Sequence, residues 1–565
     1  MLRYRLLFLY KPLRLIIPIN TMKNQFAFLL LLICNLTCFS QNYSRQDSIE
    51  GSITKERIWW DLTYYNLNIK IDLENQTLEG VNIIKYNVLE PYQTIQIDLQ
   101  PPMQMSKVLQ AGQSLEYRRE GNAYFIKLDK EQLQNETNEL KIEFSGKPKI
   151  APRPPWDPGI VWAKDSLGNH FSASIGWGAN SSNWWPCKDH TYDEVDSLKF
   201  SINVPKDYTA VGNGKLTKIL RPDKKTKTFV WLISNPINTY GINFNIGKYA
   251  HFSEQYKGEM GLLDCDYYVL AYDLEKAKEQ FKQVPKMLDA FEYWFGPYPF
   301  YEDGYKLIDV PYSGMEHQGA ITYGNGYQNG YRGSDASNTG WGDAFDYIII
   351  HESGHEWFAN NISFKDIADI WIHESFTTYS QGLFVEYHYG KQAGDDYQIG
   401  IRKGISNDKS MIGQYGINDT NYTGDNYPKG ATILHMLRQL VNDDQKWRET
   451  LRGLNKEFYH QTVTTQQIES YISGKTGLDL TNFWDQYLRT NQMPVLEYYF
   501  ANNQLSYRWT NSLKEFGMPL KIALNGLEEW IYPTTKWQSK NIETEELTLK
   551  VDRNFYVPSF YSNSN

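Results

Sequence analysis

Two histidines four residues apart, followed by a glutamate, form the most informative pattern in this chain. His351 and His355 bound the segment HESGH, and Glu374 follows nineteen positions after the second histidine. Residues four apart lie on one face of a helix, so both imidazoles can bind a single metal ion. Imidazole and carboxylate ligands suit Zn²⁺, and three protein ligands leave a fourth position for water. The pattern therefore predicts a catalytic zinc site held by His351, His355 and Glu374.

Glu352 follows the first histidine directly and has a different predicted role. One residue corresponds to about 100° of rotation around a helix, so its carboxylate can reach a zinc-activated water without binding the metal. We therefore expect Glu352 to be the general base. The apolar residues at 347–350, together with Trp357 and Phe358, favour a buried helix here. Gly354 weakens such a helix by roughly 1 kcal/mol relative to Ala, which indicates close packing.

Further motifs along the chain resemble those of the M1 family of gluzincin aminopeptidases. The segment YWFGPYPF at 293–300 resembles the turn into that family's catalytic domain, and SGMEH at 313–317 resembles its G-x-M-E-N exopeptidase motif. The zinc block at 351–376 follows, and YPKG at 427–430 matches the family's Y-x-K-G segment. The resemblance implies a thermolysin-like, mostly α catalytic domain, aminopeptidase activity and one Zn²⁺ per chain.

The resemblance also implies roles for four further residues. Glu316 is expected to bind the free α-ammonium of a peptide substrate, because a carboxylate supplies both attraction and a geometric stop. Tyr427 is expected to donate its hydroxyl to the oxyanion, and the backbone of Gly314 and Met315 to bind the substrate as an extended strand. Taken alone, Glu316 is more often a solvated carboxylate and Tyr427 is one of 42 tyrosines. Their position in the motifs carries the prediction.

Three positions depart from the family pattern. His317 stands where the family usually has asparagine, and it either tunes pH dependence or substrate choice or is an ordinary hydrogen-bonding histidine. His373 and Ser375 flank the third ligand in place of the common Asn and Gly. Ile175-Gly176-Trp177 stands where many relatives place a Gln or Glu that helps to hold the substrate amine. The first subsite is therefore expected to differ, and a side-chain preference cannot be carried over.

Composition indicates a soluble protein of several domains. Hydrophobic residues make up 41% of the 565 residues and charged residues 22%, with a net charge of −9. The 57 Lys and Arg against 66 Asp and Glu, without basic tracts, argue against a nucleic-acid partner. The expected partners are instead peptides with a free N-terminus.

The start of the chain has the pattern of a secretory signal. Met22-Lys23-Asn24 is followed by an apolar run at 26–33 and by small residues, with cleavage expected near Ser40–Gln41. The residues before Met22 leave two possibilities: translation starts at Met22, or the signal has an extended basic front. We expect export to the periplasm or the exterior, with no stable membrane span after cleavage because the apolar run is short. Only Cys187 and Cys265 would then remain, and we expect two buried thiols rather than a disulfide.

Hydrophobic periodicity predicts a multidomain α+β fold. Alternation at 67–73 and 198–204 predicts antiparallel strands, whereas 274–295, interrupted by Pro285, and 429–441 have helical periodicity. The expected domains are a signal peptide region at 1–40, an N-terminal β domain at 45–255, a zinc catalytic domain at 256–492 and a small C-terminal β module at 493–565.

These observations predict an exported zinc-dependent aminopeptidase that removes N-terminal residues from peptides by attack of zinc-activated water. Two alternatives remain. A zinc endopeptidase would cut internal bonds and would not need Glu316. A non-catalytic peptide-binding protein would be marked by loss of a metal ligand or of the general base, and this chain keeps both.

Overall fold

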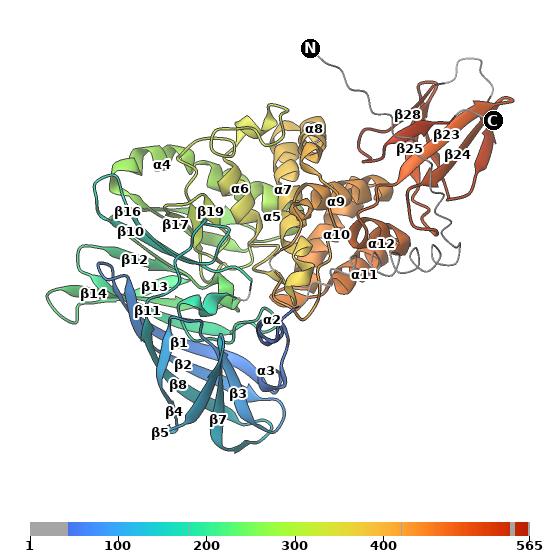
Figure 1. The fold of residues 1–565 in the computed structure, drawn as a ribbon. Helices are drawn as coiled ribbons and strands as arrows, with labels where there is room; N and C mark the ends of the chain where they lie inside the picture. Colours follow the sequence, from blue (N-terminus) through green and yellow to red (C-terminus); the bar gives the residue numbers. More distant parts are fainter. Residues whose placement is uncertain (1–42, 179, 420, 543–547, 563–565) are drawn as a thin grey trace, which may run out of the picture. The chain divides into compact units, whose positions relative to one another are not determined.

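The computed structural model of the chain describes residues 43–178, 180–419, 421–542 and 548–562. The predicted signal peptide region, residues 1–40, lies outside the described residues. Strands predominate up to residue 270, and helices predominate from residue 274 to residue 489 (Figure 1). This order confirms the predicted α+β class with a β-rich N-terminal region. None of the described helices combines the length and the apolar character that crossing a membrane requires.

The largest sheet has eight strands in the order β13-β14-β11-β1-β2-β8-β4-β5, and β1, β2, β8 and β4 lie side by side in Figure 1. Leu67, Ile69 and Ile71 of β1 are buried at alternate positions, as the period of a strand requires. The strands are β1 (Trp60–Asp72), β2 (Thr77–Val88), β4 (Gln104–Gln110), β5 (Gln113–Ser114), β8 (Thr137–Gly146), β11 (Ser197–Pro205), β13 (Lys215–Leu220) and β14 (Thr226–Ile233).

One pair in this sheet corrects the prediction of an antiparallel domain. β1 and β11 run parallel, with Leu67 opposite Phe200. The chain passes through many other strands between them, and a long connection allows a strand to return in the same direction. Periodicity within one strand carries no information about the direction of its neighbour, so the sequence could not reveal this pair.

Two smaller sheets share a hydrophobic core with the large one. Their orders are β12-β15-β10-β9 and β3-β7-β6. The common core includes Trp184, Trp185 and Cys187. Cys187 and Cys265 are both buried and free, which confirms the expectation of two thiols. The strands are β3 (Tyr92–Asp98), β6 (Glu116–Glu120), β7 (Ala123–Gln132), β9 (Gly159–Lys164), β10 (His170–Ile175), β12 (Thr209–Gly212) and β15 (Phe244–Gly247).

A five-stranded mixed sheet leads into the helical part. Its order is β16-β17-β18-β20-β19, and β18 pairs in parallel with both of its neighbours. The expected domain boundary between residues 255 and 256 falls inside β16, whose hairpin with β17 holds both sides of the boundary in one sheet. The strands are β16 (Tyr249–Gly258), β17 (Gly261–Leu270), β18 (Tyr305–Asp309), β19 (Gly314–Met315) and β20 (Ile321–Tyr323).

The predicted helix at 274–295 is two helices that separate before Pro285. α4 (Leu274–Gln280) ends and α5 (Gln283–Phe295) begins two residues ahead of the proline. Proline fits the first turn of a helix, where its missing N–H has no intrahelical acceptor, so here it helps to start α5. The other helices are α2 (Arg45–Gly51), α3 (Lys55–Ile58), α6 (Tyr347–Gly354), α7 (Trp371–Tyr389), α8 (Lys391–Ile401), α9 (Pro428–Val441), α10 (Asp444–Glu457), α11 (Thr465–Thr476) and α12 (Thr481–Arg489).

α6 is shorter than the apolar pattern around it suggests. It ends at Gly354, so Trp357 and Phe358 belong to the following turn and not to the helix. A side chain on Gly354 would place its Cβ 2.8 Å from Ser380 Oγ of α7. The glycine therefore allows α6 and α7 to pack closely, as the sequence suggested.

Strands return after α12. They form two sheets, in the orders β27-β24-β23-β29 and β26-β25-β28. Arg402 donates hydrogen bonds to the backbone carbonyls of Arg553 at 2.7 Å and Asn554 at 2.5 Å, which ties the last residues to the helical part. The strands, with the short parallel pair β21 and β22, are β21 (Ile362–Phe364), β22 (Gln461–Val463), β23 (Val495–Ala501), β24 (Gln504–Thr510), β25 (Leu520–Leu524), β26 (Leu527–Ile531), β27 (Gln538–Asn541), β28 (Leu549–Val551) and β29 (Ser559–Tyr561).

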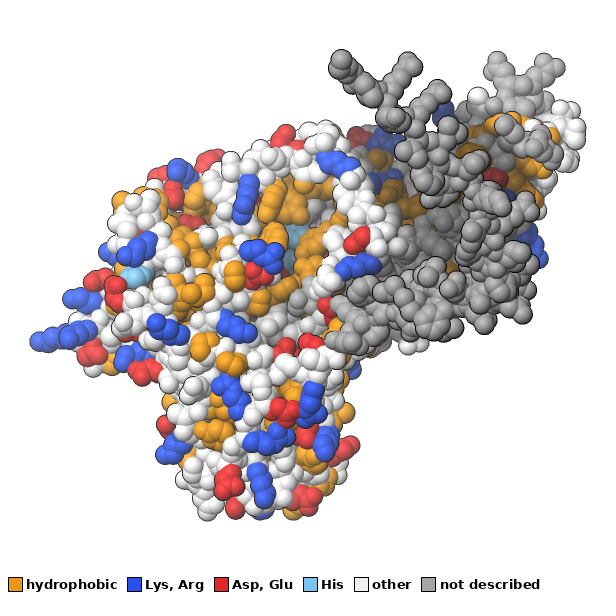
Figure 2. All heavy atoms as spheres, in the orientation of Figure 1, with side chains coloured by type: hydrophobic (Ala, Val, Ile, Leu, Met, Phe, Trp, Pro, Cys, Tyr) orange, Lys and Arg blue, Asp and Glu red, His pale blue; other side chains and the backbone are white. Residues whose placement is uncertain are grey.

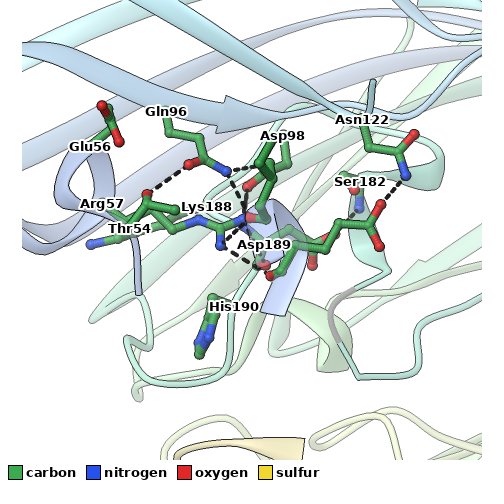
Figure 3. A network of polar contacts seen from close by, with 12 residues as sticks. Thr54, Glu56, Arg57, Gln96, Asp98, Asn122, Ser182, Lys188, Asp189 and His190 are labelled. Carbon is green, nitrogen blue, oxygen red and sulfur yellow. Dashed lines mark hydrogen bonds and ion pairs between the residues drawn. The ribbon is translucent and has the colours of Figure 1, made fainter. Parts of the chain in front are cut away.

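A buried polar network, shown in Figure 3, attaches α2 and α3 to the N-terminal strands. Arg57 Nη2 donates to Asp98 Oδ2 at 2.6 Å, and Arg57 Nη1 donates to the backbone carbonyls of Ile49 and Ser52, both at 2.9 Å. Gln96 donates to the other oxygen of Asp98 at 2.8 Å. Arg57 thus has its counter-charge and the acceptors of its Nη groups inside the fold, as a buried charge requires, whereas its Nε has no partner among the described residues.

The same network holds the segment that follows β10. Asp98 accepts the backbone N–H of Asp189, and Asp189 accepts the backbone N–H groups of Ser181 and Ser182 at 3.2 and 2.9 Å. Trp177 lies on this segment, where its carbonyl accepts a hydrogen bond from the Asn180 amide at 3.2 Å. The N-terminal region therefore fixes the position of Trp177.

Candidate active site

α6 and α7 bring the predicted metal ligands together. His351 and Glu352 lie in the last turn of α6, His355 directly follows it, and Glu374 lies in the first turn of α7. All four side chains are buried. Asp346 is the N-cap residue that precedes α6. Its carboxylate accepts backbone N–H groups of the first turn, which lack partners within the helix.

The three ligand side chains converge on one point. Glu374 Oε2 lies 3.7 Å from His351 Nε2 and 3.6 Å from His355 Nε2. The other ring nitrogens face second partners: the Gln381 amide lies 2.8 Å from His351 Nδ1, and His355 Nδ1 donates to the Phe358 carbonyl at 3.1 Å. Such partners fix the orientation of each ring, with both Nε2 atoms facing Glu374.

This donor set fits a zinc ion. Glu374 Oε2 is buried and has no hydrogen-bond partner among the described residues. Two atoms about 2.1 Å from a tetrahedral zinc lie roughly 3.4 Å apart, close to the observed 3.6 and 3.7 Å. Burial lowers the pKa of His351 to about 3 and that of His355 to about 4, which keeps both imidazoles in the neutral form that binds metal.

Glu352 lies beside this set without joining it. Its carboxylate groups with Glu316 and His355, with ligand atoms within 4.8 Å of one another. Burial raises the pKa of Glu352 well above its usual range, and the carboxylates of Glu316 and Glu374 raise it further. A cation bound at the ligand set opposes these effects and favours the charged carboxylate that a general base needs.

Glu316 directly follows β19 and is 4% exposed. Burial, then the Glu374 carboxylate, raises the pKa of Glu316 to about 8. Its backbone carbonyl accepts a hydrogen bond from Asn360 at 2.9 Å, whereas Oε1 has no partner among the described residues. A buried carboxylate oxygen without a donor is a binding position for a cationic group.

Gly314 and Met315 form β19, the edge strand of the five-stranded sheet. A Cβ on Gly314 would lie 2.7 Å from Ile348 Cγ2 and 3.1 Å from Glu352 Oε1. The glycine lets the strand pass directly beside the predicted general base. An edge strand also offers backbone N–H and C=O groups to an added strand.

Tyr427 precedes α9 and is partly buried, with its ring stacked on His351 at a centroid distance of 6.0 Å. Burial, then the Glu374 carboxylate, raises the pKa of Tyr427 well above its usual range. The hydroxyl therefore keeps its proton at neutral pH and can act as a hydrogen-bond donor at the metal site.

A cavity of about 460 Å³ contains all of these residues. Figure 2 shows a hollow edged by hydrophobic side chains with histidine at its floor. Three carboxylates, those of Glu316, Glu352 and Glu374, line the cavity, and its described lining includes neither Lys nor Arg. The cavity therefore holds three carboxyl groups for which its described lining supplies no cationic side chain, in keeping with their raised pKa values.

The two histidines that depart from the family pattern differ from the ligands. His317 Nε2 accepts the backbone N–H of Gly176 at 3.4 Å, and its Nδ1 lies 3.0 Å from Asn243. Burial lowers the pKa of His317 to about 3, which favours the reading as an ordinary hydrogen-bonding histidine over a pH sensor. His373 accepts the backbone N–H of Phe364 at 2.9 Å and stacks on that ring, so it braces the strand before α7.

Sequence reasoning missed two residues that orient the ligands. Gln381 contacts His351, and Thr377 Oγ1 lies 3.0 Å from His355 Nδ1. Both follow Glu374 on α7 at helical spacing, three and seven residues on, so the period of the helix could have identified them. The carboxylate of Asp369, also near the start of α7, accepts hydrogen bonds from the hydroxyl groups of Thr465 and Tyr415 and not from a predicted metal ligand.

Comparison with known proteins agrees with this geometry. Residues 279–487 match the model of the peptidase family M1 domain. Probable aminopeptidase 1 of Sulfurisphaera tokodaii is 21% identical over 512 residues, which are 86% of this chain and 61% of that protein. Tricorn protease-interacting factor F2 of Thermoplasma volcanium is 25% identical over 367 residues, 62% of this chain and 44% of that protein. The chain thus spans about half the length of the curated relatives it matches.

The fold has counterparts among solved structures. The crystal structure of a mutant M1 zinc metallopeptidase from Deinococcus radiodurans superposes with a TM-score of 0.67 at 19% identity, covering 80% of this chain and 99% of that one. Fold and ligand set define the class of zinc metallopeptidases. Within that class, the match over residues 279–487 identifies a peptidase family M1 domain in this chain.

Proposed function

We propose that this chain is a zinc-dependent aminopeptidase that removes N-terminal residues from peptides. The observation that carries the proposal is the set of three carboxyl groups in the cavity, with neither Lys nor Arg in its described lining. A zinc ion contributes two positive charges and the ammonium of a substrate a third. Zinc and a free N-terminus together neutralise the site, whereas an internal peptide segment leaves one carboxylate without a partner.

Different residues of the chain bind the metal, transfer the proton and stabilise the oxyanion. His351, His355 and Glu374 would hold zinc, which supplies a Lewis acid that polarises the first peptide carbonyl and lowers the pKa of water. Glu352 removes a proton from the attacking water and returns it to the leaving amine. Tyr427 donates its hydroxyl to the carbonyl oxygen as negative charge develops there, a contribution of about 3 kcal/mol for one well-placed donor.

Two further elements position the substrate. The free Oε1 of Glu316 accepts from the substrate ammonium, so the first residue stops at a fixed distance from the metal ligands. The free edge of β19 pairs with the substrate backbone as an added strand.

Two further proposals concern the N-terminal and C-terminal segments. We propose that the protein is exported, on the basis of the basic and apolar pattern at 22–40. The strands β23 to β29, which follow the last helix, support a small C-terminal β module over 493–565.

Hydrolysis of aminoacyl fluorogenic amides with free and acetylated N-termini tests the activity. The zinc-loaded protein is expected to cleave only the free-amine set, and Glu352→Gln to lower kcat by about 10²- to 10⁴-fold with zinc content unchanged. Glu279→Gln, a matched change at a 75% exposed carboxylate, serves as the control and should leave kcat unaltered.

Two results would contradict the proposal. Equal cleavage of acetylated substrates would make the protein an endopeptidase and remove the role of Glu316. Absence of cleavage by a folded, zinc-loaded protein across peptides of several lengths would make it a peptide-binding protein.

A further inference from the structure

We infer that the first subsite selects peptides with a bulky apolar N-terminal side chain, aromatic or branched aliphatic, through a wall formed by Trp177, Tyr422 and Met315. The inference rests on the proposed aminopeptidase function and names its substrate class. Three observations support it: the position of the first side chain beside Glu316, the apolar residues around that position, and the lack of Lys and Arg in the described lining.

The position of the first side chain follows from the two ends of the first residue. Its ammonium lies at Glu316 and its carbonyl at the metal ligands, and these atoms are only about 2.5 Å apart because a single Cα joins them. The side chain on that Cα therefore lies next to Glu316. The leaving residue lies beyond the carbonyl, toward Glu352, which delivers its proton.

Apolar groups surround this place. Met315 directly precedes Glu316, and it packs in one hydrophobic cluster with Trp177, against which Tyr422 also lies. The rings of Trp177 and Tyr422 meet edge to face, with centroids 5.5 Å apart. Tyr422 lines the same cavity as Glu316 and Glu374.

The wall offers nothing to a charged side chain. The only carboxylates in the described lining are Glu316, Glu352 and Glu374, which the ammonium, the proton transfer and the metal already use. An N-terminal Lys or Arg would bury a cation without a carboxylate of its own. An N-terminal Asp or Glu would add a fourth negative charge where no Lys or Arg is found among the described lining residues.

Trp177 is held in place rather than loosely packed. It is 6% exposed, and the preceding Gly176 lies so close to Tyr240 that an added Cβ would be 2.1 Å from its carbonyl oxygen. The network through Asp189 fixes the residues that follow. A rigid aromatic wall gains binding energy from apolar side chains without an ordering cost.

A second aromatic wall lies beside His351. Tyr347 stacks on His351 at 5.2 Å, and Tyr331 meets Tyr347 edge to face at 5.3 Å. Both line the same cavity with Ile348. This wall faces the leaving residue, so it provides an internal control for the assignment of the first subsite.

The test compares kcat/KM for free-amine amides of Leu, Phe, Ala, Lys, Arg and Glu in the zinc-loaded full chain. The wild type is expected to prefer Leu and Phe over Ala, Lys, Arg and Glu by about 100-fold or more, since each buried methylene contributes roughly 10-fold or more. Trp177→Gln and Trp177→Glu form a matched pair that differs only in charge. Both variants should lower kcat/KM for the Leu and Phe amides by at least about 10-fold. Only Trp177→Glu should raise kcat/KM for the Lys and Arg amides, to about 10-fold above the value for Trp177→Gln.

Tyr331→Ala serves as the control on the second wall. With dipeptide substrates it should change the preference for the second residue and leave the order of first residues as in the wild type. Thermal melting and zinc content of each variant show that it is folded and loaded.

The outcomes separate the inference from the proposed function. Wild-type preference for Lys, Arg or Glu, or an unchanged order of first residues in both Trp177 variants, would overturn the inference while the aminopeptidase activity stands. Failure to cleave any free-amine amide would instead overturn the proposed function.

Discussion

Two buried groups of charge in this protein differ in how their charges are balanced. In the N-terminal network, Arg57 pairs with Asp98 at 2.6 Å, and Asp189 accepts two backbone N–H groups. In the cavity of the catalytic region, Glu316 and Glu374 each keep a buried oxygen without a partner among the described residues. The charges of the first group are paired inside the fold, although Arg57 Nε has no hydrogen-bond partner among the described residues, whereas the carboxylates of the second group have neither Lys nor Arg beside them in the described lining of the cavity.

This difference distinguishes charged groups that stabilise the fold from carboxyl groups that are available to a ligand. Removing one member of a complete buried pair leaves an uncompensated charge and costs stability. Buried carboxyl groups without a cationic neighbour have raised pKa values, and a bound cation favours their charged form, so they indicate what binds there. Substitutions in the N-terminal network should therefore change stability, and substitutions in the cavity should change activity.

The largest effect is expected from removing a metal ligand. His355→Ala should abolish aminopeptidase activity, because zinc then loses one of its three protein ligands. Zinc at 100 times its Kd should stabilise the wild type by about 2.7 kcal/mol by mass action. Thermal melting with and without zinc checks this, and an equal response of wild type and His355→Ala would contradict the assignment of the site.

A change in the N-terminal network should affect stability and not catalysis. Asp98→Asn leaves the guanidinium of Arg57, which is fully buried, without its counter-charge. The free energy of unfolding should fall by about 3–5 kcal/mol. Urea denaturation measures the loss, and kcat of the folded fraction should stay within about threefold of wild type.

Removing the phenol donor should affect catalysis and not stability. Tyr427→Phe keeps the ring that stacks on His351 and deletes only the hydroxyl. We expect kcat to fall by about 10²- to 10³-fold with little change in KM, as for loss of one oxyanion donor. An unchanged kcat would assign the oxyanion to another group.

The smallest effect, counted per pH unit, is a dependence of stability on pH. Burial, then Asp98, raises the pKa of Asp189 to about 7 in the folded protein, against about 4 in an unfolded chain. A raised pKa contributes stability below pH 4, and this stability is lost as pH rises to 7, by at most about 1.4 kcal/mol per unit. Urea denaturation at pH 4.5, 5.5, 6.5 and 7.5 should show this slope in the wild type relative to Asp189→Asn. Parallel curves would contradict it.

The metal site could be predicted in detail because its information is local. The spacing of His351 and His355 follows from the helical period, and Glu374 follows in the next helix. The neutral state of His317 and the ligand contact of Gln381 depend instead on groups brought in from other elements. The same holds for the parallel pairing of β1 with β11, which no local pattern encodes.

The sequence by itself determined the α+β class and the placement of His351 and His355 on one helix face, because period and residue type fix these locally. That Cys187 and Cys265 are free thiols in different core clusters was decided by the fold. Tertiary structure alone decided that Trp177 and Tyr422 meet beside Glu316, although 245 positions separate the two aromatic residues. It also decided that Glu316, Glu352 and Glu374 share one cavity without Lys or Arg in its described lining. Charge balance and side-chain fit are properties of a volume, and only the folded chain defines which residues enclose it.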